Sequence, residues 1–398
     1  MNPTTGPTTV STPVPIVLAG ARGHGRWHVE NIRRLQDKGL VRLAGICELT
    51  PLTEEEFGGE LPAQSADFGA LLDSTGAQVA VVCTPIPTHT DLALAAAKRG
   101  VHLLLEKPPA PTLAGYQQIV DAVTEARIAC QVGFQSLGSA AVDRAARLVR
   151  DGELGAVHGI SAAGAWQRDS TYYTRARWAG RRTLDGVDVV DGALTNPFAH
   201  ALETALRVDG SDQDDLIGDV ELELWHAYDI DSDDTAALRL TTGRGTTVTV
   251  AVTLCAADPG LPRVVVHGER GRAVLWYNRD QLVLDGDAGP PVTSSRVDLL
   301  DNLIDHIADP DVPLIVPLAS TRAFMQAVEA VRLAPPPRAV PRRFLQISQV
   351  ENAVGPAERR TVPGVEDLVQ ASADRLALFS ELDAPWARAV DSAGTVTG

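Results

Sequence analysis

Residues 14–25 read VPIVLAGARGHG, and this stretch decides the expected fold. Its first six residues show no polar alternation, as in a strand that is buried on both faces of a parallel sheet. Three glycines follow, and a helical pattern runs on over 27–35. Glycines allow a tight turn from strand to helix, and they let backbone N–H groups approach a pyrophosphate at the helix N-terminus. The turn that we expect to bind a dinucleotide comprises Gly20, Arg22, Gly23, His24 and Gly25.

An acidic residue follows the second strand-like run, Val41–Cys47. This residue, Glu48, lies roughly 20 residues beyond the turn, where a carboxylate accepts hydrogen bonds from the adenosine ribose and repels a 2′-phosphate. We therefore expect NAD as the cofactor, with NADP less favoured. Arg22 stands in the usual place of the second glycine. It could neutralise the pyrophosphate, or it could pair with a 2′-phosphate.

Strand and helix patterns alternate through the first third of the chain. Further apolar runs occur at 79–83, 101–105 and 128–132, and helical patterns begin near Thr90 and Thr112. Such repetition is the doubly wound α/β plan. We expect one Rossmann domain over residues 14–134, preceded by a Pro/Thr/Ser-rich disordered leader over residues 1–13.

The pattern changes from residue 135 onward. Strand-like runs separated by Gly and Asp turns indicate an antiparallel sheet with one face solvated. We expect an α+β substrate and oligomerisation domain over 135–333, and a C-terminal extension over 334–398 that packs on the core. The runs are 220–226, 235–240, 246–254, 263–267, 273–277 and 282–284, and helical patterns cover 297–307, 321–333 and 365–382.

Composition excludes several classes of partner. The net charge is −16, from 51 acidic and 35 basic residues, which argues against nucleic acid or an anionic membrane surface. No apolar stretch approaches the ~18 residues of a membrane span. The cysteines, Cys47, Cys83, Cys130 and Cys255, lie in separate strand-like runs without zinc-ligand spacing. We expect buried thiols, no metal site and a cytoplasmic protein.

Two further motifs lie where buried strands end. Residues 83–89 read CTPIPTH and residues 106–108 read EKP. Ligands sit at this carboxyl edge of a parallel sheet. Lys107 could polarise the oxygen of an alcohol or ketone, or pass a proton if desolvation lowers its pKa. Both motifs also have an explanation without function. Residues 83–89 could form a proline-stiffened loop with a surface histidine, and residues 106–108 could carry an ordinary Glu-Lys pair at a helix start.

Together these segments closely resemble the glucose–fructose oxidoreductase / inositol dehydrogenase / MocA family. The resemblance is strongest across residues 14–135 and continues more loosely to about residue 333. It implies a Rossmann domain followed by a large, open, mostly antiparallel sheet, with the nicotinamide near Lys107. Members mostly oxidise or reduce sugars, inositols and related hydroxy compounds, which places them in carbohydrate metabolism. By this resemblance the cofactor also contacts Thr84, Pro85, His89, Glu106 and Lys107.

The resemblance also implies catalytic residues. In the family, the lysine of the EKP motif works with a later Asp-x-x-x-His pair on one helix. Here residues 191–200 read DGALTNPFAH. His200 matches the general acid/base, whereas Asn196 replaces the aspartate and can orient a hydroxyl without exchanging a proton. Asp191 lies five residues earlier and could restore a carboxylate.

An aromatic and basic stretch precedes that segment. Aromatic rings and guanidinium groups suit sugar rings and their hydroxyls or acids. The same side chains could equally pack the helix onto the sheet. The candidate substrate-binding residues are Tyr172, Tyr173, Arg175 and Trp178.

The leading hypothesis is an NAD-dependent oxidoreductase that transfers hydride between nicotinamide and a hydroxyl or carbonyl carbon of a sugar, glycoside or polyol. Lys107 would stabilise the oxygen, His200 would handle its proton, and Asn196 with Asp191 would position it. Two alternatives stay open: an NAD-dependent glycosidase, lyase or epimerase that oxidises its sugar transiently, and a non-catalytic dinucleotide-sensing protein. We also expect a homo-oligomer formed through the sheet face.

Overall fold

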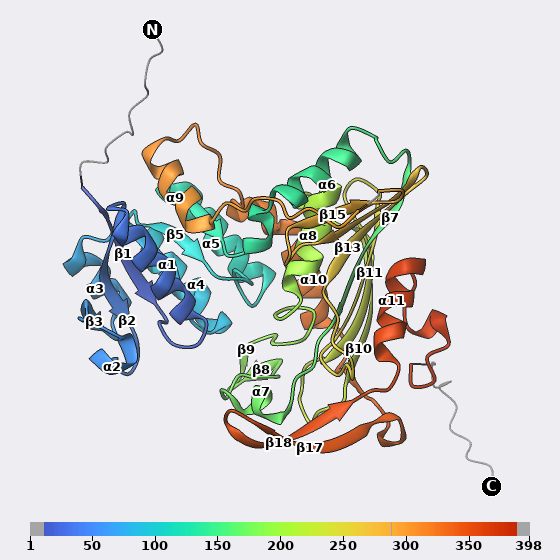
Figure 1. Ribbon diagram of the computed structural model, residues 1–398. Helices are drawn as coiled ribbons and strands as arrows, with labels where there is room; N and C mark the ends of the chain where they lie inside the picture. Colours follow the sequence, from blue (N-terminus) through green and yellow to red (C-terminus); the bar gives the residue numbers. More distant parts are fainter. Residues whose placement is uncertain (1–11, 288, 388–398) are drawn as a thin grey trace. The chain divides into compact units, whose positions relative to one another are not determined.

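The computed structural model describes residues 12–287 and 289–387. All but Thr12 and Pro13 of the predicted leader therefore lies outside the described residues. The chain divides into two compact units, which are described separately (Figure 1). Unit 1 takes in the chain up to Ala110, Ala114–Gln135 and Val297–Ala319, and unit 2 takes in Pro111–Leu113, Ser136–Arg296 and the chain from Ser320 onward.

Unit 1 is built on a six-stranded sheet in the order β3-β2-β1-β4-β5-β6. Every neighbouring pair is parallel, and this strand order is that of a Rossmann fold. The predicted doubly wound domain is therefore confirmed. The strands are β1 (Val14–Ala19), β2 (Val41–Cys47), β3 (Ala63–Ser65), β4 (Val79–Val82), β5 (His102–Leu105) and β6 (Cys130–Val132). The helices are α1 (Gly25–Asp37), α2 (Glu54–Phe57), α3 (Phe68–Thr75), α4 (His89–Ala97), α5 (Leu113–Ala126) and α9 (Leu299–Ala308).

The α9 segment, residues 297–319, belongs to unit 1, although the sequence placed it within the substrate domain over 135–333. Its link to β6 is a set of side-chain hydrogen bonds. Gln131 Nε2 donates to Asn302 Oδ1 at 2.8 Å, and Val316 N donates to Gln131 Oε1 at 2.8 Å. Helical periodicity predicted α9 itself, but it carries no information on which sheet the helix joins.

Unit 2 contains an eight-stranded sheet in the order β15-β14-β13-β7-β12-β11-β10-β16. Only β7–β12 and β10–β16 pair in parallel, so the predicted mostly antiparallel sheet is confirmed. A two-stranded sheet joins β8 (Thr183–Leu184) to β9 (Val187–Asp188). The main strands are β7 (Val157–Ala165), β10 (Ile217–His226), β11 (Thr235–Thr241), β12 (Thr247–Thr253), β13 (Arg263–Gly268), β14 (Gly271–Trp276), β15 (Gln281–Leu284) and β16 (Arg338–Ala339).

Both faces of this sheet are covered around β7. A Cβ on Gly164 would lie 2.2 Å from the Phe198 ring, whereas a Cβ on Gly159 would lie 2.6 Å from the Leu376 side chain. Residues five apart in a strand face opposite sides. The prediction of a solvated face was therefore wrong, because the C-terminal extension packs there (Figure 1). One face carries α6 (Ala140–Arg150), α8 (Ala199–Asp209) and α10 (Arg322–Leu333), and the other carries α11 (Val365–Arg375).

The C-terminal extension also forms a hairpin that the sequence did not suggest. Strand β17 (Gln346–Asn352) pairs antiparallel with β18 (Gly355–Thr361). Beyond it, α11 ends at Arg375 rather than near residue 382 as predicted, because Leu376 adopts a left-handed conformation. The extension then buries Phe379 and Trp386 in the core of unit 2, as expected for a segment that packs on the core.

All four cysteines are free thiols. Cys130 and Cys255 are buried as predicted, whereas Cys47 and Cys83 are partly exposed. Burial raises the pKa of the Cys130 thiol to about 12. Over the described part of the chain, no helix combines the length and apolar character needed to cross a bilayer.

Candidate functional site

The predicted dinucleotide turn joins β1 to α1 at very close range. Gly20 has a φ of +83°, and a Cβ there would lie 2.4 Å from the carbonyl oxygen of Cys83. A Cβ on Gly25 would lie 1.9 Å from the carbonyl oxygen of Gly20. Gly23 also has a positive φ, of +58°, but faces open space. Only glycine therefore fits at positions 20 and 25, and this lets the chain turn tightly from β1 into α1, as a pyrophosphate-binding turn requires.

Glu48, the predicted ribose-binding residue, lies against this turn. Its Oε1 accepts hydrogen bonds from Ala21 N at 2.6 Å and from Arg22 N at 3.2 Å. The Arg22 guanidinium lies 3.4 Å from Glu48 Oε2 and 3.2 Å from Glu56 Oε2, and it donates to Thr50 O at 2.8 Å. Arg22 is therefore engaged with acidic groups, which supports the preference for NAD over NADP.

We predict that Glu48→Gln weakens discrimination between the two cofactors. The amide keeps the shape and can still accept from Ala21 N, but it no longer repels a 2′-phosphate, and it releases Arg22 from one ion pair. The NADP-to-NAD affinity ratio, measured by tryptophan fluorescence titration, should rise by about tenfold, which corresponds to ~1.4 kcal/mol. An unchanged ratio would remove Glu48 from the cofactor site.

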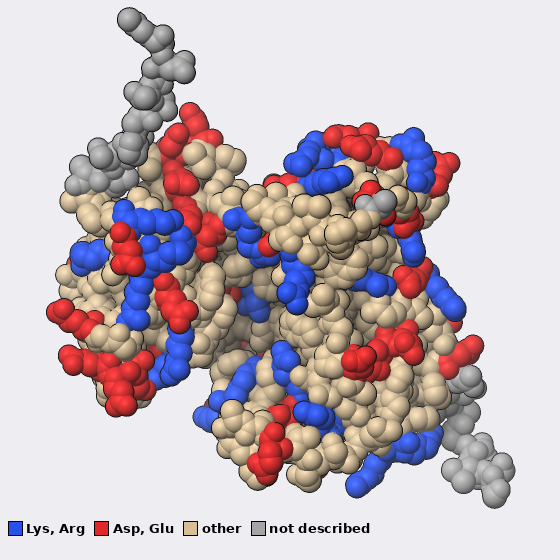
Figure 2. All heavy atoms as spheres, in the orientation of Figure 1, with Lys and Arg blue, Asp and Glu red and all other residues tan. Residues whose placement is uncertain are grey.

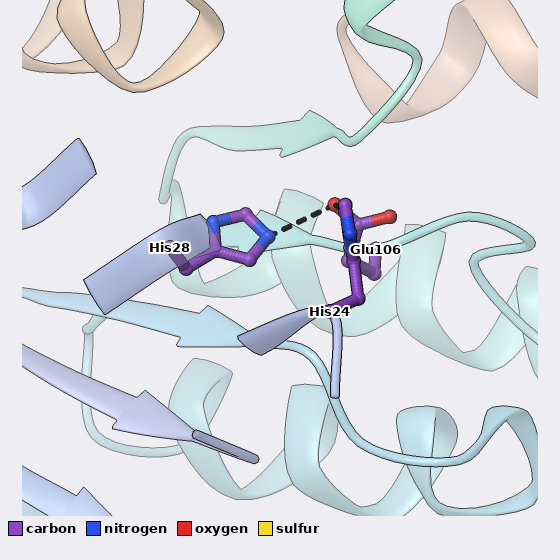
Figure 3. Close-up of side chains that lie close together, drawn as sticks. All are labelled: His24, His28 and Glu106. Atoms are coloured by element: carbon purple, nitrogen blue, oxygen red, sulfur yellow. Dashed lines mark hydrogen bonds and ion pairs between the residues drawn. The ribbon is translucent and has the colours of Figure 1, made fainter. Parts of the chain in front are cut away.

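Glu106 directly follows β5, and its carboxylate lies close to two histidines, one in the turn and one in α1 (Figure 3). His28 Nε2 lies 3.0 Å from Glu106 Oε1, and His24 Nε2 lies 3.6 Å from the same oxygen. Gln135 Nε2 also donates to it at 2.9 Å. Burial alone would raise the pKa of Glu106, but hydrogen bonds and charge from the two histidines outweigh burial and hold it well below its usual range. Glu106 is thus an ionised carboxylate that ties the EKP segment to the turn.

The same three side chains have the donor types of a divalent metal site. Their ligand atoms all lie within 4.8 Å of one another. Metal bonds of ~2.0–2.1 Å to nitrogen or oxygen suit this spacing. However, His28 Nδ1 is buried without a hydrogen-bond partner in the described residues, whereas a metal-bound imidazole normally donates its second N–H to an acceptor. The arrangement therefore favours a hydrogen-bonded carboxylate over a metal site. The spacing of these three residues along the chain did not predict that they would meet.

His89, which was predicted to contact the cofactor, has both ring nitrogens against main-chain carbonyl oxygens. It is buried, with Nδ1 2.8 Å from Pro108 O and Nε2 2.8 Å from Thr84 O. Burial lowers the pKa of this imidazole, although both carbonyl contacts act in the opposite direction. His89 therefore braces the Thr84-Pro85 loop against the segment that follows Lys107.

In unit 2, the structure brings Asp191 and Asn196 together. Asn196 Nδ2 donates to Asp191 Oδ1 at 2.6 Å, and Gly180 N donates to Asp191 Oδ2 at 2.8 Å. The sequence had placed Asn196 and His200 on one helix face. Instead α8 begins only at Ala199, and Asn196 lies in the preceding turn, where Pro197 separates it from the helix. A carboxylate nevertheless lies beside the asparagine.

His200 lies in the first turn of α8 and contacts a serine that sequence reasoning missed. Ser136 Oγ lies 3.1 Å from His200 Nδ1 and 3.2 Å from Thr204 Oγ1, and Ser136 is buried. Thr204 could have been anticipated, since it follows His200 by four residues on the same helix face. Ser136 comes from a distant part of the sequence, so no local pattern indicated it.

The aromatic stretch divides between two roles. The Arg175 guanidinium lies 3.7 Å from the centre of the Tyr172 ring and 4.7 Å from that of Trp178. Arg175 also pairs with Asp191 Oδ2 at 3.3 Å, so these side chains extend the Asp191 cluster. Tyr173 instead packs with the buried core of unit 2. Tyr172, Arg175 and Trp178 therefore form one group that Arg175 joins to Asp191, whereas Tyr173 packs against the core.

Comparison with known proteins gives consistent matches. Residues 14–134 match a family profile described as "Oxidoreductase family, NAD-binding Rossmann fold", and residues 142–274 match one described as "GFO/IDH/MocA C-terminal domain". Levoglucosan dehydrogenase of Pseudarthrobacter phenanthrenivorans is 27% identical over 160 residues, which are 40% of this chain and 39% of that protein. The chain thus matches about two fifths of that relative's length.

Longer matches cover most of the chain at lower identity. Myo-inositol 2-dehydrogenase of Thermotoga maritima is 23% identical over 273 residues, which are 67% of this chain and 77% of that protein. Among solved structures, the WlbA dehydrogenase from Bordetella pertussis in complex with NADH and UDP-GlcNAcA gives a TM-score of 0.66 at 20% identity. That superposition covers 80% of this chain and 95% of the other, and it supports the fold.

Proposed function

Because the chain belongs to the glucose–fructose oxidoreductase / inositol dehydrogenase / MocA family of oxidoreductases with an NAD-binding Rossmann fold, we propose that it oxidises or reduces a CH–OH carbon of a sugar, glycoside or polyol. The observation that carries this proposal is the position of Lys107. It follows Glu106, whose carboxylate contacts the glycine turn through His24 and His28. A cationic side chain thus lies at the ligand edge of the sheet, next to the group that anchors the turn.

The residues present fit NAD. The glycine turn gives the pyrophosphate a site without Cβ atoms, and Glu48 offers carboxylate oxygens to the adenosine ribose. When bound, the nicotinamide supplies hydride chemistry. Lys107 stabilises the substrate oxygen, and His200 accepts or returns its proton. Asn196, held by Asp191, orients a hydroxyl.

The direct test is an assay for NADH absorbance with purified protein, NAD and a panel of polyols, aldoses and glycosides. We expect net NADH production with at least one of them, as befits a relative of levoglucosan and inositol dehydrogenases. Exchange of substrate hydrogen with solvent deuterium at a constant NADH level would instead indicate transient oxidation. Absence of both activities across the panel would leave only cofactor binding.

We predict that Ser136→Ala lowers kcat by up to about tenfold, the range of one neutral hydrogen bond of ~0.5–1.5 kcal/mol. The reason is that Ser136 holds Nδ1 of His200 and thereby fixes which ring nitrogen faces the substrate. The pH profile of kcat should change as well, whereas KM should stay nearly constant. Steady-state kinetics from pH 6 to 9 measure all three.

Ser136→Thr serves as the matched control, since it keeps a hydroxyl at this position. It should retain most of the activity and the original pH profile. If Ser136→Ala shows wild-type kcat and an unaltered pH profile, Ser136 has no positioning role.

A homo-oligomer remains a prediction, and its proposed contact needs revision. The expected sheet-face contact requires a free face, but α11 and the residues after it occupy the side of the sheet marked by Gly159 and Ala163. A second copy would therefore have to use another surface, or displace the extension.

A further inference from the structure

A pocket of about 270 Å³ lies where the segment before α7 (Ser170–Thr174) meets the C-terminal hairpin. This volume is slightly below the ~300 Å³ at which typical small-molecule sites begin. The pocket therefore suits one substituent of a larger ligand rather than a whole cofactor. It is lined by Gln167, Arg168, Asp169, Thr171, Tyr172 and Arg359, all of unit 2.

Two arginines in this lining have no ion pair within residues 12–287 and 289–387. Arg359 Nε is buried without a hydrogen-bond partner there. Arg168 donates to the main-chain oxygen of Gln167 and lies over the rings of Trp166 and Tyr172. Two neighbouring arginines, by contrast, form ion pairs: Arg177 with Asp185 at 3.1 Å and Arg181 with Asp231 at 2.8 Å. Figure 2 shows basic side chains gathered on this part of unit 2, around α7 and β8–β9.

The one acid in the lining does not neutralise both arginines. Asp169 Oδ1 accepts from Thr171 N at 3.0 Å, and Asp169 Oδ2 accepts from Asn352 Nδ2 at 2.9 Å. These bonds direct its carboxylate toward the cap of α7 and the hairpin. With two guanidinium groups and one carboxylate, the pocket keeps a net positive charge.

The pocket is continuous with the Asp191 cluster through one aromatic ring. Tyr172 lines the pocket, and the centre of its ring lies 5.2 Å from the Arg168 guanidinium and 3.7 Å from that of Arg175. Arg175 in turn pairs with Asp191, which holds Asn196. A ligand that reaches Asn196 with one part can therefore place another part in the pocket.

We propose that Arg168 and Arg359 bind an oxyanion, a carboxylate or phosphate, carried by the substrate, so that the substrate is an acidic sugar. Guanidinium groups bind such groups through charge-assisted, often bidentate hydrogen bonds. The C-terminal hairpin then has a role in substrate selection, since it supplies Arg359 from β18. That the anion belongs to the substrate rests on the proposed function, but the anion site itself can be tested by binding alone.

The test is isothermal titration calorimetry of the NAD-saturated full chain with D-glucuronate, D-glucose 6-phosphate and D-glucose. We expect at least one anionic sugar to bind at least about tenfold more tightly than glucose. Arg359→Gln and Arg168→Gln should each weaken that sugar by about tenfold, or ~1.4 kcal/mol, and leave glucose unaffected. If only glucuronate binds tightly, the pocket is a carboxylate site. If only glucose 6-phosphate binds tightly, it is a phosphate site.

Two controls separate charge recognition from damage to the fold. Arg279→Gln removes an exposed arginine of unit 2 outside the pocket and should change nothing. Arg359→Lys keeps the charge without the planar fork and should bind with intermediate affinity. Equal affinity for glucose and the acids, no binding of either acid to the wild-type chain, or wild-type affinity in both glutamine variants would each overturn the proposal.

Failure of the anion site and failure of the proposed function give different results. Turnover of a neutral polyol without any preference for acids would refute the anion site and keep the oxidoreductase. Tight, arginine-dependent binding of an acidic sugar that is never oxidised or reduced would support the anion site and refute its role in substrate turnover.

Discussion

Replacing Lys107 by methionine should lower kcat by about 10²- to 10⁴-fold, the usual contribution of a positioned group that handles charge or a proton in the transition state. Methionine has a similar length but no ammonium, so the substrate oxygen loses its stabilising charge. NAD binding should persist, because the glycine turn and the Glu48 carboxylate, which we expect to hold the pyrophosphate and the ribose, are unchanged in this variant. Steady-state turnover and a fluorescence titration with NAD measure the two quantities.

Lys98 offers the matched control, since it is an exposed lysine at the end of α4. Lys98→Met should leave both kcat and NAD affinity unchanged. Wild-type turnover in Lys107→Met would refute the catalytic assignment, whereas loss of NAD binding in that variant would show that Lys107 serves the cofactor instead.

Removing the charge of Glu203 should make the protein more stable at alkaline pH. Glu203 lies in α8 with 0% exposure, and neither carboxylate oxygen has a hydrogen-bond partner among the described residues. Burial, and then the charge of Asp212, raise the pKa of this carboxyl well above its usual range, although Arg207 acts in the opposite direction. The folded state therefore holds the proton more tightly than the unfolded chain does.

The sign of the pH dependence follows from this difference. A carboxyl with a raised pKa in the folded state contributes stability below its unfolded pKa, and the contribution is lost as pH rises through the folded value. An unpaired buried group costs ~1–3 kcal/mol, so Glu203→Gln should raise Tm by roughly 5 °C at pH 8 relative to the wild type. The gain should shrink at pH 5. Thermal unfolding by circular dichroism at both pH values measures it.

Glu153→Gln is the control, because Glu153 is an exposed glutamate of the same unit. It should show the wild-type dependence of Tm on pH. If Glu203→Gln destabilises the protein equally at pH 5 and pH 8, the carboxylate must have a partner that compensates its burial.

The first unit could be predicted well because its signals are local. Strands such as β1 and β4 are buried on both faces and are apolar throughout, so each shows as a continuous apolar run. Gly20, Gly25 and Glu48 follow strands at short range, where steric limits and the Rossmann pattern restrict the choice of residue.

The central strand of the second sheet was missed for a packing reason. Strand β7 reads VHGISAAGA, a composition poor in the branched and aromatic residues that mark strands. The small residues are needed because Phe198 and Leu376 press onto this strand at Gly164 and Gly159. Tertiary packing, rather than strand propensity, set this sequence.

Most contacts within the candidate site could not be predicted, because the residues that meet there are far apart in the sequence. Ser136 meets His200 across 64 residues of chain, and His28 meets Glu106 across 78. Arg359 reaches its pocket from a hairpin that had no assigned structure. A single sequence reveals such pairs only through a known family pattern. Ser136, His28 and Arg359 fall outside the motifs that carried the resemblance.

The discontinuous course of unit 1 bears on how the protein is made. Its last segment, which includes α9, is synthesised only after the 161 residues of unit 2 from Ser136 to Arg296 have followed Gln135. Asn302 follows its partner Gln131 of β6 by 171 residues, so at a translation rate of ~5–20 residues per second it is synthesised about 9 to 34 s later. During that interval the surface of unit 1 that the buried leucines of α9 cover stays exposed, so unit 1 completes its fold only after most of unit 2 has been synthesised.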